Sequence, residues 1–257
     1  MSRTNKQERC SCLLSVLSFA ATMQSMPTAP PRTARDFARI ELTRTILGSA
    51  RAQLAAVGPG ELSVRAVARD VGMASSAVYR YFPSRDHLIT ALLVECYDES
   101  GEAVERADDA VPRARYRKRW LAMAAAFRTW AQTNFHEYAL LYGSPVPGYA
   151  APDETIAPAQ RVPARLLGLM AEVEAAGLPL GPGDSRVPRA VRASFRPIRE
   201  AYGGVGDERM MRALTAWATL LGQLTLELFG HLESGVLDYD AHFTHMMERV
   251  ADDLGLP

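Results

Sequence analysis

The sequence is short of the features by which many protein classes are recognised. Its three cysteines, Cys10, Cys12 and Cys96, form no CxxC pair, which argues against a disulfide scaffold or a zinc module. The 29 basic and 29 acidic residues cancel, so total charge gives no signal for nucleic acid, although binding depends on where the charge lies. It has no GxSxG, HExxH, GxGxxG or phosphate-loop motif. The sequence therefore indicates no enzyme class, no cofactor and no metal.

Long hydrophobic runs are also scarce. The one notable run, "CLLSVLSFAA" at residues 12–21, has the length of a signal-peptide core and is too short to span a bilayer. It permits an exported or membrane-associated helical binding protein. The alternative, which we favour, is that translation begins at Met23 or Met26 and that residues 1–31 are a disordered or mis-assigned extension. On that interpretation the protein is cytoplasmic and has no membrane partner.

Helical periodicity dominates the rest of the chain, with no convincing strand and no repeat, so the predicted fold class is all-α. Gly, Pro and capping residues divide the pattern. The predicted helices cover residues 34–57, 64–71, 75–82, 85–106, 116–142, 153–178 (interrupted by Pro158 and Pro163), 189–202 (containing Pro197), 207–232 and 239–254. Ser63, Ser84 and one of Ser75 or Ser76 are the predicted caps of three of these helices.

The segment from Ser63 to Phe82 carries the clearest motif. Ala68 precedes Gly72 by four residues, and Val78 follows it by six. A small residue lets a second helix approach the first, a glycine permits a sharp turn, and a branched apolar residue fills the gap. This spacing predicts a helix-turn-helix whose second helix can enter a DNA major groove.

The outward side of that motif supplies the predicted DNA contacts. Serine hydroxyls and an alanine methyl suit base edges, whereas tyrosine and arginine suit phosphates. The helix terminus at Ser63 could hold another phosphate. The predicted contacts are Ser63, Arg65, Ser75, Ser76, Ala77, Tyr79, Arg80, Tyr81 and Arg85. The preceding arm adds five arginines, Arg32, Arg35, Arg39, Arg44 and Arg51, against two acids.

The segment "ELSVRAVARDVGMASSAVYRYFPSRDHLITALL" resembles the DNA-binding module of the tetracycline-repressor (TetR) family, over about Arg35 to Leu93. Tyr79, Phe82 and Leu88 stand where that family has the same residues. Arg85 stands where it often has lysine. The resemblance implies a helix-turn-helix domain over residues 32–83 and a larger helical domain for ligand binding and dimerisation over residues 84–257.

The segments "YALLYGSPVPGYAAP" and "AWATLLGQLTLELFGHL" resemble a regulatory domain of TetR-type proteins named after a Trp-His-Gly signature. Trp217 and Gly222 match that signature, but Leu221 replaces its histidine. The resemblance therefore implies no particular ligand.

Three further sets of residues allow a functional and a plain structural interpretation. An aromatic and methionine stripe could be helical core or the wall of a pocket for a small hydrophobic effector. Its predicted lining residues are Trp120, Met123, Phe127, Trp130, Tyr138, Tyr142 and Trp217. His242, His245 and Glu248 are spaced three apart, but a solvated helix face is the favoured interpretation over a metal site. The last two helices are predicted to form a dimer interface, centred on Leu220, Leu224, Leu228 and Phe229.

Together these patterns predict a homodimeric transcriptional regulator, a repressor, that binds a near-palindromic double-stranded DNA operator. An effector held by the C-terminal helices would shift the helix after Arg85 and change the separation of the two DNA-binding domains. An exported binding protein and a helical enzyme remain the alternatives, separable by the native N-terminus and by turnover.

Overall fold

The computed structural model describes residues 33–183 and 186–257. No strand occurs within these ranges, which confirms the all-α prediction. None of the helices described is both long enough and apolar enough to cross a membrane. The predictions for residues 1–31, including the apolar run and two of the cysteines, lie outside the described residues.

The chain divides into two compact units. The N-terminal unit comprises residues 33–97 and 134–155, and the C-terminal unit comprises the described residues of 98–133 and 156–257. Helix α5 (Arg85–Asp109) contributes residues to both units. The expected boundary after residue 83 groups the chain differently, because the first half of α5 packs with the helices that precede it.

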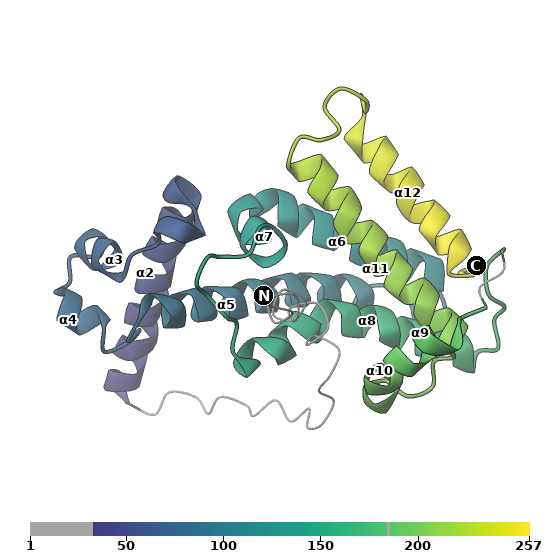
Figure 1. Cartoon of the computed structure of the whole chain (residues 1–257), viewed down its shortest axis with the longest axis horizontal. Helices are drawn as coiled ribbons and strands as arrows, with labels where there is room; N and C mark the ends of the chain where they lie inside the picture. The colour runs from purple at the N-terminus through teal and green to yellow at the C-terminus, as the bar shows by residue number, and fades with distance from the viewer. Residues whose placement is uncertain (1–32, 184–185) are drawn as a thin grey trace, which may run out of the picture. The chain divides into compact units, whose positions relative to one another are not determined.

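The N-terminal unit is built around one apolar cluster. Its helices are α2 (Ala34–Val57), α3 (Val64–Asp70), α4 (Ser75–Val78), the start of α5, and α7 (Phe135–Tyr142), with short 3-10 turns at Pro59–Glu61 and Asp153–Thr155 (Figure 1). The fully buried members of its core are Ile46, Ala50, Leu54, Val67, Ala68, Val78, Leu88, Ile89 and Leu92. Helices as short as α3 and α4 are at best marginally stable by themselves in water. The burial of these side chains is what stabilises α3 and α4.

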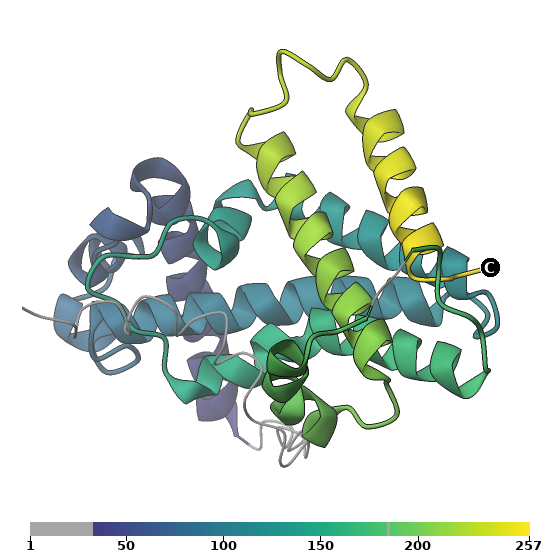
Figure 2. The same cartoon turned by 45° about the vertical axis from the view of Figure 1, so that its right-hand side comes forward.

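The C-terminal unit holds both long and short helices besides the end of α5. They are α6 (Tyr116–Thr133), α8 (Ile156–Ala175), α9 (Arg189–Ser194), α10 (Arg196–Ala201), α11 (Asp207–Leu228) and α12 (Tyr239–Asp253). Helix α11 packs against α6, α8 and α12, and Figure 2 shows α11 and α12 side by side, joined by the loop at the top of the view.

Several predicted helices have boundaries that differ from those in the structure. The run 116–142 breaks at Asn134, whose backbone is non-helical, so it forms α6 and α7. Helix α11 ends at Leu228 because Gly230 adopts a positive φ of 76° and the amides of Gly230 and His231 bond back to Glu227 and Leu226. These two bonds form a Schellman motif, which ends a helix.

Proline has less effect on α8 than the sequence predicts. Pro158 lies in the first turn, where backbone amides have no partner within the helix. Pro163 lies inside the helix, which nevertheless continues to Ala175. The buried side chains Val162, Leu166 and Met170 flank it, and their packing offsets the lost hydrogen bond.

Buried arginines distinguish the interior of the C-terminal unit. Arg119 and Asp108 are each 1% exposed, and the guanidinium Nε lies 2.7 Å from the carboxylate. Arg119 also donates to Glu172 at 2.6 Å, so this cluster ties α5, α6 and α8 together. Burial alone would lower the pKa of Arg119, but the hydrogen bonds to Asp108 and Glu172 raise it above its ordinary value. Arg119 therefore stays charged throughout the physiological pH range.

Candidate nucleic-acid interface

The turn between α3 and α4 has the geometry that the sequence predicts. Gly72 has a φ of 68°, a left-handed conformation that glycine adopts without strain. Its amide donates to the carbonyl of Arg69 (3.2 Å), and the amide of Met73 donates to the carbonyl of Ala68 (2.9 Å). This pair of bonds is another Schellman motif, and it turns the chain directly out of α3.

Two fully buried side chains hold the crossing of the helices. Ala68 and Val78 are 1% and 0% exposed and belong to the same apolar cluster. Helix α4 is short, but the amides of Arg80, Tyr81 and Phe82 donate to carbonyls three or four residues earlier, so the helical turn continues to Phe82. Because Phe82 is also buried, both ends of this turn are fixed to the core.

The other side of α4 carries polar side chains toward solvent. Ser76, Tyr79 and Arg80 are exposed, Tyr79 by 38%. Ser75, Ala77 and Tyr81 are half-buried, and Arg65 is exposed on α3. The predicted contact residues on α3 and α4 therefore share one unit, and three of the six on α4 and its last turn are exposed. From Leu62 to Arg85 the only acidic residue is Asp70, against four arginines. This local excess of positive charge suits a phosphate backbone.

Two of the three predicted serine caps are confirmed and the third is wrong. The hydroxyl of Ser63 accepts from the amide of Ala66 at 3.4 Å, as expected, and Ser84 accepts from the amide of His87 at 3.3 Å. The N-cap of α4 is Ala74, with no side-chain bond, so the prediction of a Ser75 or Ser76 cap is wrong. As a result, capping does not occupy the hydroxyls of Ser75 and Ser76.

Arg85 has a role that the sequence does not indicate. Its Nη2 donates to the carbonyls of Pro59 (2.6 Å) and Gly60 (3.0 Å), in the turn before α3. Its guanidinium is thus engaged within the N-terminal unit, whereas Arg80 projects outward. We therefore treat Arg85 as a positioning residue for α3.

Sequence reasoning missed two contacts that fix α5 in the N-terminal unit. Arg51 of α2 donates twice to Glu95 of α5, at 2.9 and 3.1 Å, and lies 3.8 Å from Glu137 of α7. The hydroxyls of Thr90 and Tyr149 are 2.8 Å apart. Only a knowledge of the fold brings these distant residues together, so no local sequence signal could have found them.

The residues predicted to line an effector pocket fall into two groups. Trp120, Met123, Phe127 and Trp130 are buried in α6, and the rings of Phe127 and Trp217 are 5.6 Å apart in the C-terminal unit. Tyr138 and Tyr142 lie instead in the N-terminal unit, with ring centroids 5.2 Å apart. Burial raises the pKa of Tyr142 well above its usual value, and the neighbouring Tyr97 and Tyr138 add to this effect.

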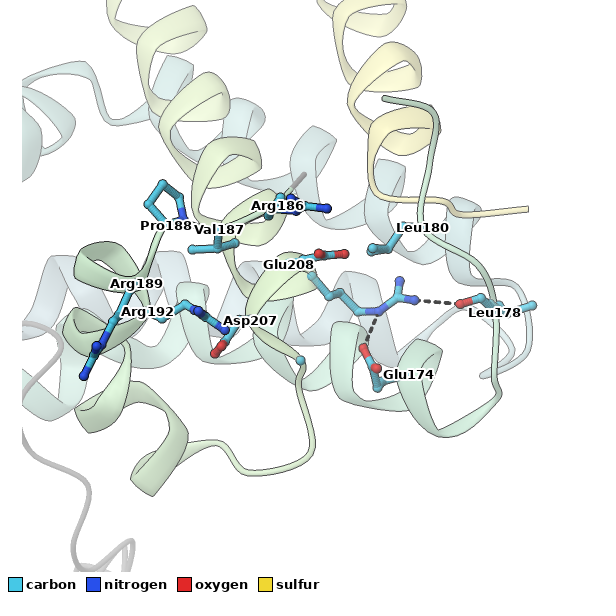
Figure 3. A pocket seen from close by; sticks show the side chains of 12 residues that line it. Glu174, Leu178, Leu180, Arg186, Val187, Pro188, Arg189, Arg192, Asp207 and Glu208 are labelled. Atoms are coloured by element: carbon cyan, nitrogen blue, oxygen red, sulfur yellow. Dashed lines mark hydrogen bonds and ion pairs between the residues drawn. The ribbon is translucent and has the colours of Figure 1, made fainter. Parts of the chain in front are cut away.

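A cavity of about 790 Å³ opens elsewhere in the C-terminal unit (Figure 3). It lies among the end of α8 and its following loop, α9, and the start of α11, and it includes none of the predicted lining residues. Its apolar side chains are Leu178, Leu180, Val187 and Pro188, and its charged ones are Glu174, Arg186, Arg189, Arg192, Asp207, Glu208 and Arg209. Arg209 donates to Glu174 and to the backbone of Leu178, the dashed lines in Figure 3, and these bonds fix one wall.

The structure corrects the predicted centre of the dimer interface. Leu220 and Leu224 are 3% and 0% exposed within the single chain, because they face the core of the C-terminal unit. They can offer almost no area to a partner. Leu228 and Phe229, at the end of α11, are half-buried.

The histidine pattern on α12 has structural partners. His242 Nδ1 lies 3.0 Å from the side-chain amide of Gln223, and Glu248 accepts from Arg117 at 2.6 Å. His245 is exposed. No group of His, Cys, Asp and Glu suited to a metal ion occurs in the part of the chain that the structure describes.

Two family models match the chain. Residues 46–92 match the model for bacterial regulatory proteins of the tetR family, and residues 120–250 match a tetracyclin repressor-like C-terminal domain. HTH-type transcriptional regulators of Mycobacterium tuberculosis (Rv1816) and Mycobacterium bovis (Mb1846) are each 40% identical over 207 residues. That alignment covers 79% of this chain and 87% of each regulator.

Solved structures agree with these matches. The crystal structure of the regulatory protein SCO4313 is similar with a TM-score of 0.68 and 30% identity, covering 85% of this chain and 98% of that one. The TetR family regulator PfmR from Thermus thermophilus shares the fold, with a TM-score of 0.54 at 14% identity over 82% of this chain and 98% of its own. With its helix-turn-helix, both family models and these relatives, the chain belongs to the TetR family of bacterial DNA-binding transcriptional regulators.

Proposed function

We propose that the protein is a cytoplasmic repressor that binds a near-palindromic operator as a homodimer and responds to a small effector. The observation that carries DNA binding is the hydrogen-bonded α3–α4 turn, which presents Ser76, Tyr79 and Arg80 outward from a buried core. Ser75, Ser76 and Ala77 would contact base edges in the major groove. Arg65, Tyr79, Arg80, Tyr81 and the α3 terminus at Ser63 would contact the phosphate backbone.

The test is to replace Tyr79 and Arg80 with alanine together. We expect operator affinity to fall at least about a hundredfold with unchanged folding, since both side chains are exposed and a hydrogen bond to a charged phosphate is worth about 1.5–3 kcal/mol. The matched control replaces Arg115 and Tyr116, an arginine–tyrosine pair in the C-terminal unit, and should bind normally. Fluorescence anisotropy with DNA fragments selected from genomic DNA measures both. Unchanged binding by the Tyr79/Arg80 variant would exclude α4 as the reading helix.

For the dimer, we propose the outward face of α11, together with α12. Between Met210 and Leu226 the only charged residue is Arg212, which is buried and bonded to Asp253. Met211, Ala218, Gly222 and Leu226 are exposed on this helix. An uncharged helix face that is accessible in the single chain fits a self-complementary twofold contact.

A charge on this face should separate the protomers. Ala218→Glu should yield a monomer in sedimentation or light scattering, because two carboxylates would meet near the twofold axis without partners. Ala125→Glu places the same charge at an exposed position of α6 and should leave the dimer intact. A dimeric Ala218→Glu protein would rule out this face.

For the effector, the buried aromatic side chains of α6 remain one proposed site, and the cavity of Figure 3 is the alternative. Its volume suits a small ligand, and its mixture of apolar and arginine side chains suits an amphipathic acid better than a purely hydrophobic molecule. A ligand that binds one conformation preferentially would shift α5, which is anchored in the C-terminal unit by Arg161 to Asp98 and Glu105. Calorimetry with fatty acids, comparing Arg192→Gln with the wild type, distinguishes the two sites. If Arg192→Gln binds the fatty acid more weakly than the wild type, the result favours the cavity. If both proteins bind it with equal affinity, the result favours the aromatic site.

A further inference from the structure

The first three turns of α2, Ala34–Thr45, project beyond the core of the N-terminal unit. Every residue there except Thr43 is exposed, and the buried face of α2 begins only at Ile46. Phe37 and Ile40 are 58% and 45% exposed. The match to the tetR-family model also begins at residue 46. These turns therefore contribute little to the folding of the unit.

The projection is nevertheless a well-formed helix. Thr33 and Asp36 form a reciprocal capping box, in which the Thr33 hydroxyl accepts from the amide of Asp36 (3.2 Å) and Asp36 accepts from the amide of Thr33 (3.1 Å). Arg44 pairs with Glu41 one turn away. A cap of this kind is worth about 1 kcal/mol. A helix held at its start but exposed along its length is suited to contacting something outside the unit.

The charges of the projection point to a polyanion. Arg35 and Arg39 are four residues apart, so they lie on the same helix face. Both are exposed, and among the described residues no hydrogen bond or ion pair involves either side chain. The two acids of the projection are occupied, Asp36 by the cap and Glu41 by Arg44. The face with Arg35 and Arg39 therefore presents two arginine side chains outside any ion pair, beside a single carboxylate, Asp36, that is bonded to the helix cap.

The rest of α2 ties this face to the DNA-reading helices. Ser49 donates to Asp70 at the end of α3 (2.6 Å), and Gln53 accepts from the amide of Ser63 at its start (3.4 Å). A helix rises 1.5 Å per residue, so the twelve projecting residues reach about 18 Å beyond Ile46, the first buried residue of α2. That length is about half a turn of B-DNA, whose pitch is about 34 Å.

We propose that the projecting turns of α2 bind the phosphate backbone of DNA beside the half-site read by α4, through Arg35 and Arg39. This proposal rests on the proposed operator binding and extends its footprint. The contact adds affinity for any duplex that is long enough to reach the projection, and it adds no base specificity.

The test measures the salt dependence of binding. Arg35→Gln/Arg39→Gln should lower the slope of log K against log salt by about 1.8, since each phosphate contact contributes about 0.9. The loss should be the same for operator and for non-specific duplex. Arg115→Gln/Lys118→Gln removes two exposed charges from the C-terminal unit and should leave the slope unchanged. The wild type should also lose its advantage over the Arg35/Arg39 variant when the flanking base pairs of the operator are removed.

The outcomes separate this proposal from the proposed function. A wild-type protein that binds no duplex would refute operator binding itself. A wild type that binds, with an Arg35/Arg39 variant of equal slope, would overturn the role of the projection alone. A change of oligomeric state in Phe37→Ser/Ile40→Ser, with DNA binding unaffected by the arginine variant, would identify a second copy of the chain as its partner and would also overturn the proposal.

Discussion

The two units of the chain use arginine in opposite ways. In the C-terminal unit, Arg119, Arg209 and Arg212 are buried, and each bonds to a carboxylate and to backbone carbonyls of another segment. In the described part of the N-terminal unit no charged side chain is buried, and Arg65 and Arg80 are exposed. Buried arginines thus stabilise the C-terminal unit, whereas Arg65 and Arg80 of the N-terminal unit remain accessible to a partner.

This difference explains how a chain with no net charge can bind DNA. Buried ion pairs are neutralised locally and contribute little to the field outside the protein. The exposed arginines of α3 and α4 face solvent with few acidic residues nearby. Little negative charge on the protein therefore weakens their attraction to a phosphate backbone. The amino-acid composition counts buried and exposed arginines alike, and only the burial of each side chain distinguishes the two groups.

The largest effect should come from breaking the charged interior. Arg119→Met leaves Asp108 buried with its closest partner removed, and we expect unfolding free energy to fall by about 3–5 kcal/mol. Arg113 contacts the same carboxylate at 3.2 Å, but its side chain is 58% exposed. Arg113→Met should therefore cost under about 1 kcal/mol. Urea unfolding of both variants measures the contrast, and equal losses of unfolding free energy would mean that Asp108 depends on Arg119 no more than on Arg113.

An intermediate effect should follow from changing the turn of the N-terminal unit. Gly72→Ala forces a side chain into a left-handed backbone and should cost about 1–2 kcal/mol. Gly48 lies in α2 with open space around it and no positive φ, so Gly48→Ala should stabilise by about 0.4–1 kcal/mol. Thermal unfolding distinguishes the two. A neutral Gly72→Ala variant would show that the turn tolerates another conformation.

The sequence was sufficient to predict the helix-turn-helix because that motif is local. Ala68, Gly72 and Val78 lie within eleven residues, and their spacing specifies both the turn and the crossing. The same holds for α2 and α12, whose observed limits match the predicted ones within a residue. The break at Asn134 was missed because both flanking segments continue a helical pattern.

Contacts between distant residues were not predictable in this way. The predicted dimer contacts Leu220 and Leu224 are apolar and correctly placed in a helix, but periodicity does not say which apolar face meets the core and which meets a partner. Likewise Arg85 looks equivalent to Arg80 in sequence, and only the carbonyls of Pro59 and Gly60 show that it is engaged.

Arg80 and Arg85, two arginines five residues apart in one unit, permit the comparison with the smallest expected effects. Arg80→Gln should leave stability within about 0.5 kcal/mol, because the side chain is exposed, and should lower the salt slope of DNA binding by about 0.9. Arg85→Gln should instead cost about 1 kcal/mol of stability, since two backbone carbonyls lose a charged donor, a loss moderated by partial exposure. It should leave the salt slope nearly unchanged, because its charge holds the turn before α3 and not a phosphate. Urea unfolding and anisotropy titrations on the same preparations measure both quantities. If Arg85→Gln lowers the slope as much as Arg80→Gln, its guanidinium exchanges the carbonyls for phosphate on binding, and the distinction between engaged and accessible arginines holds only for the DNA-free protein.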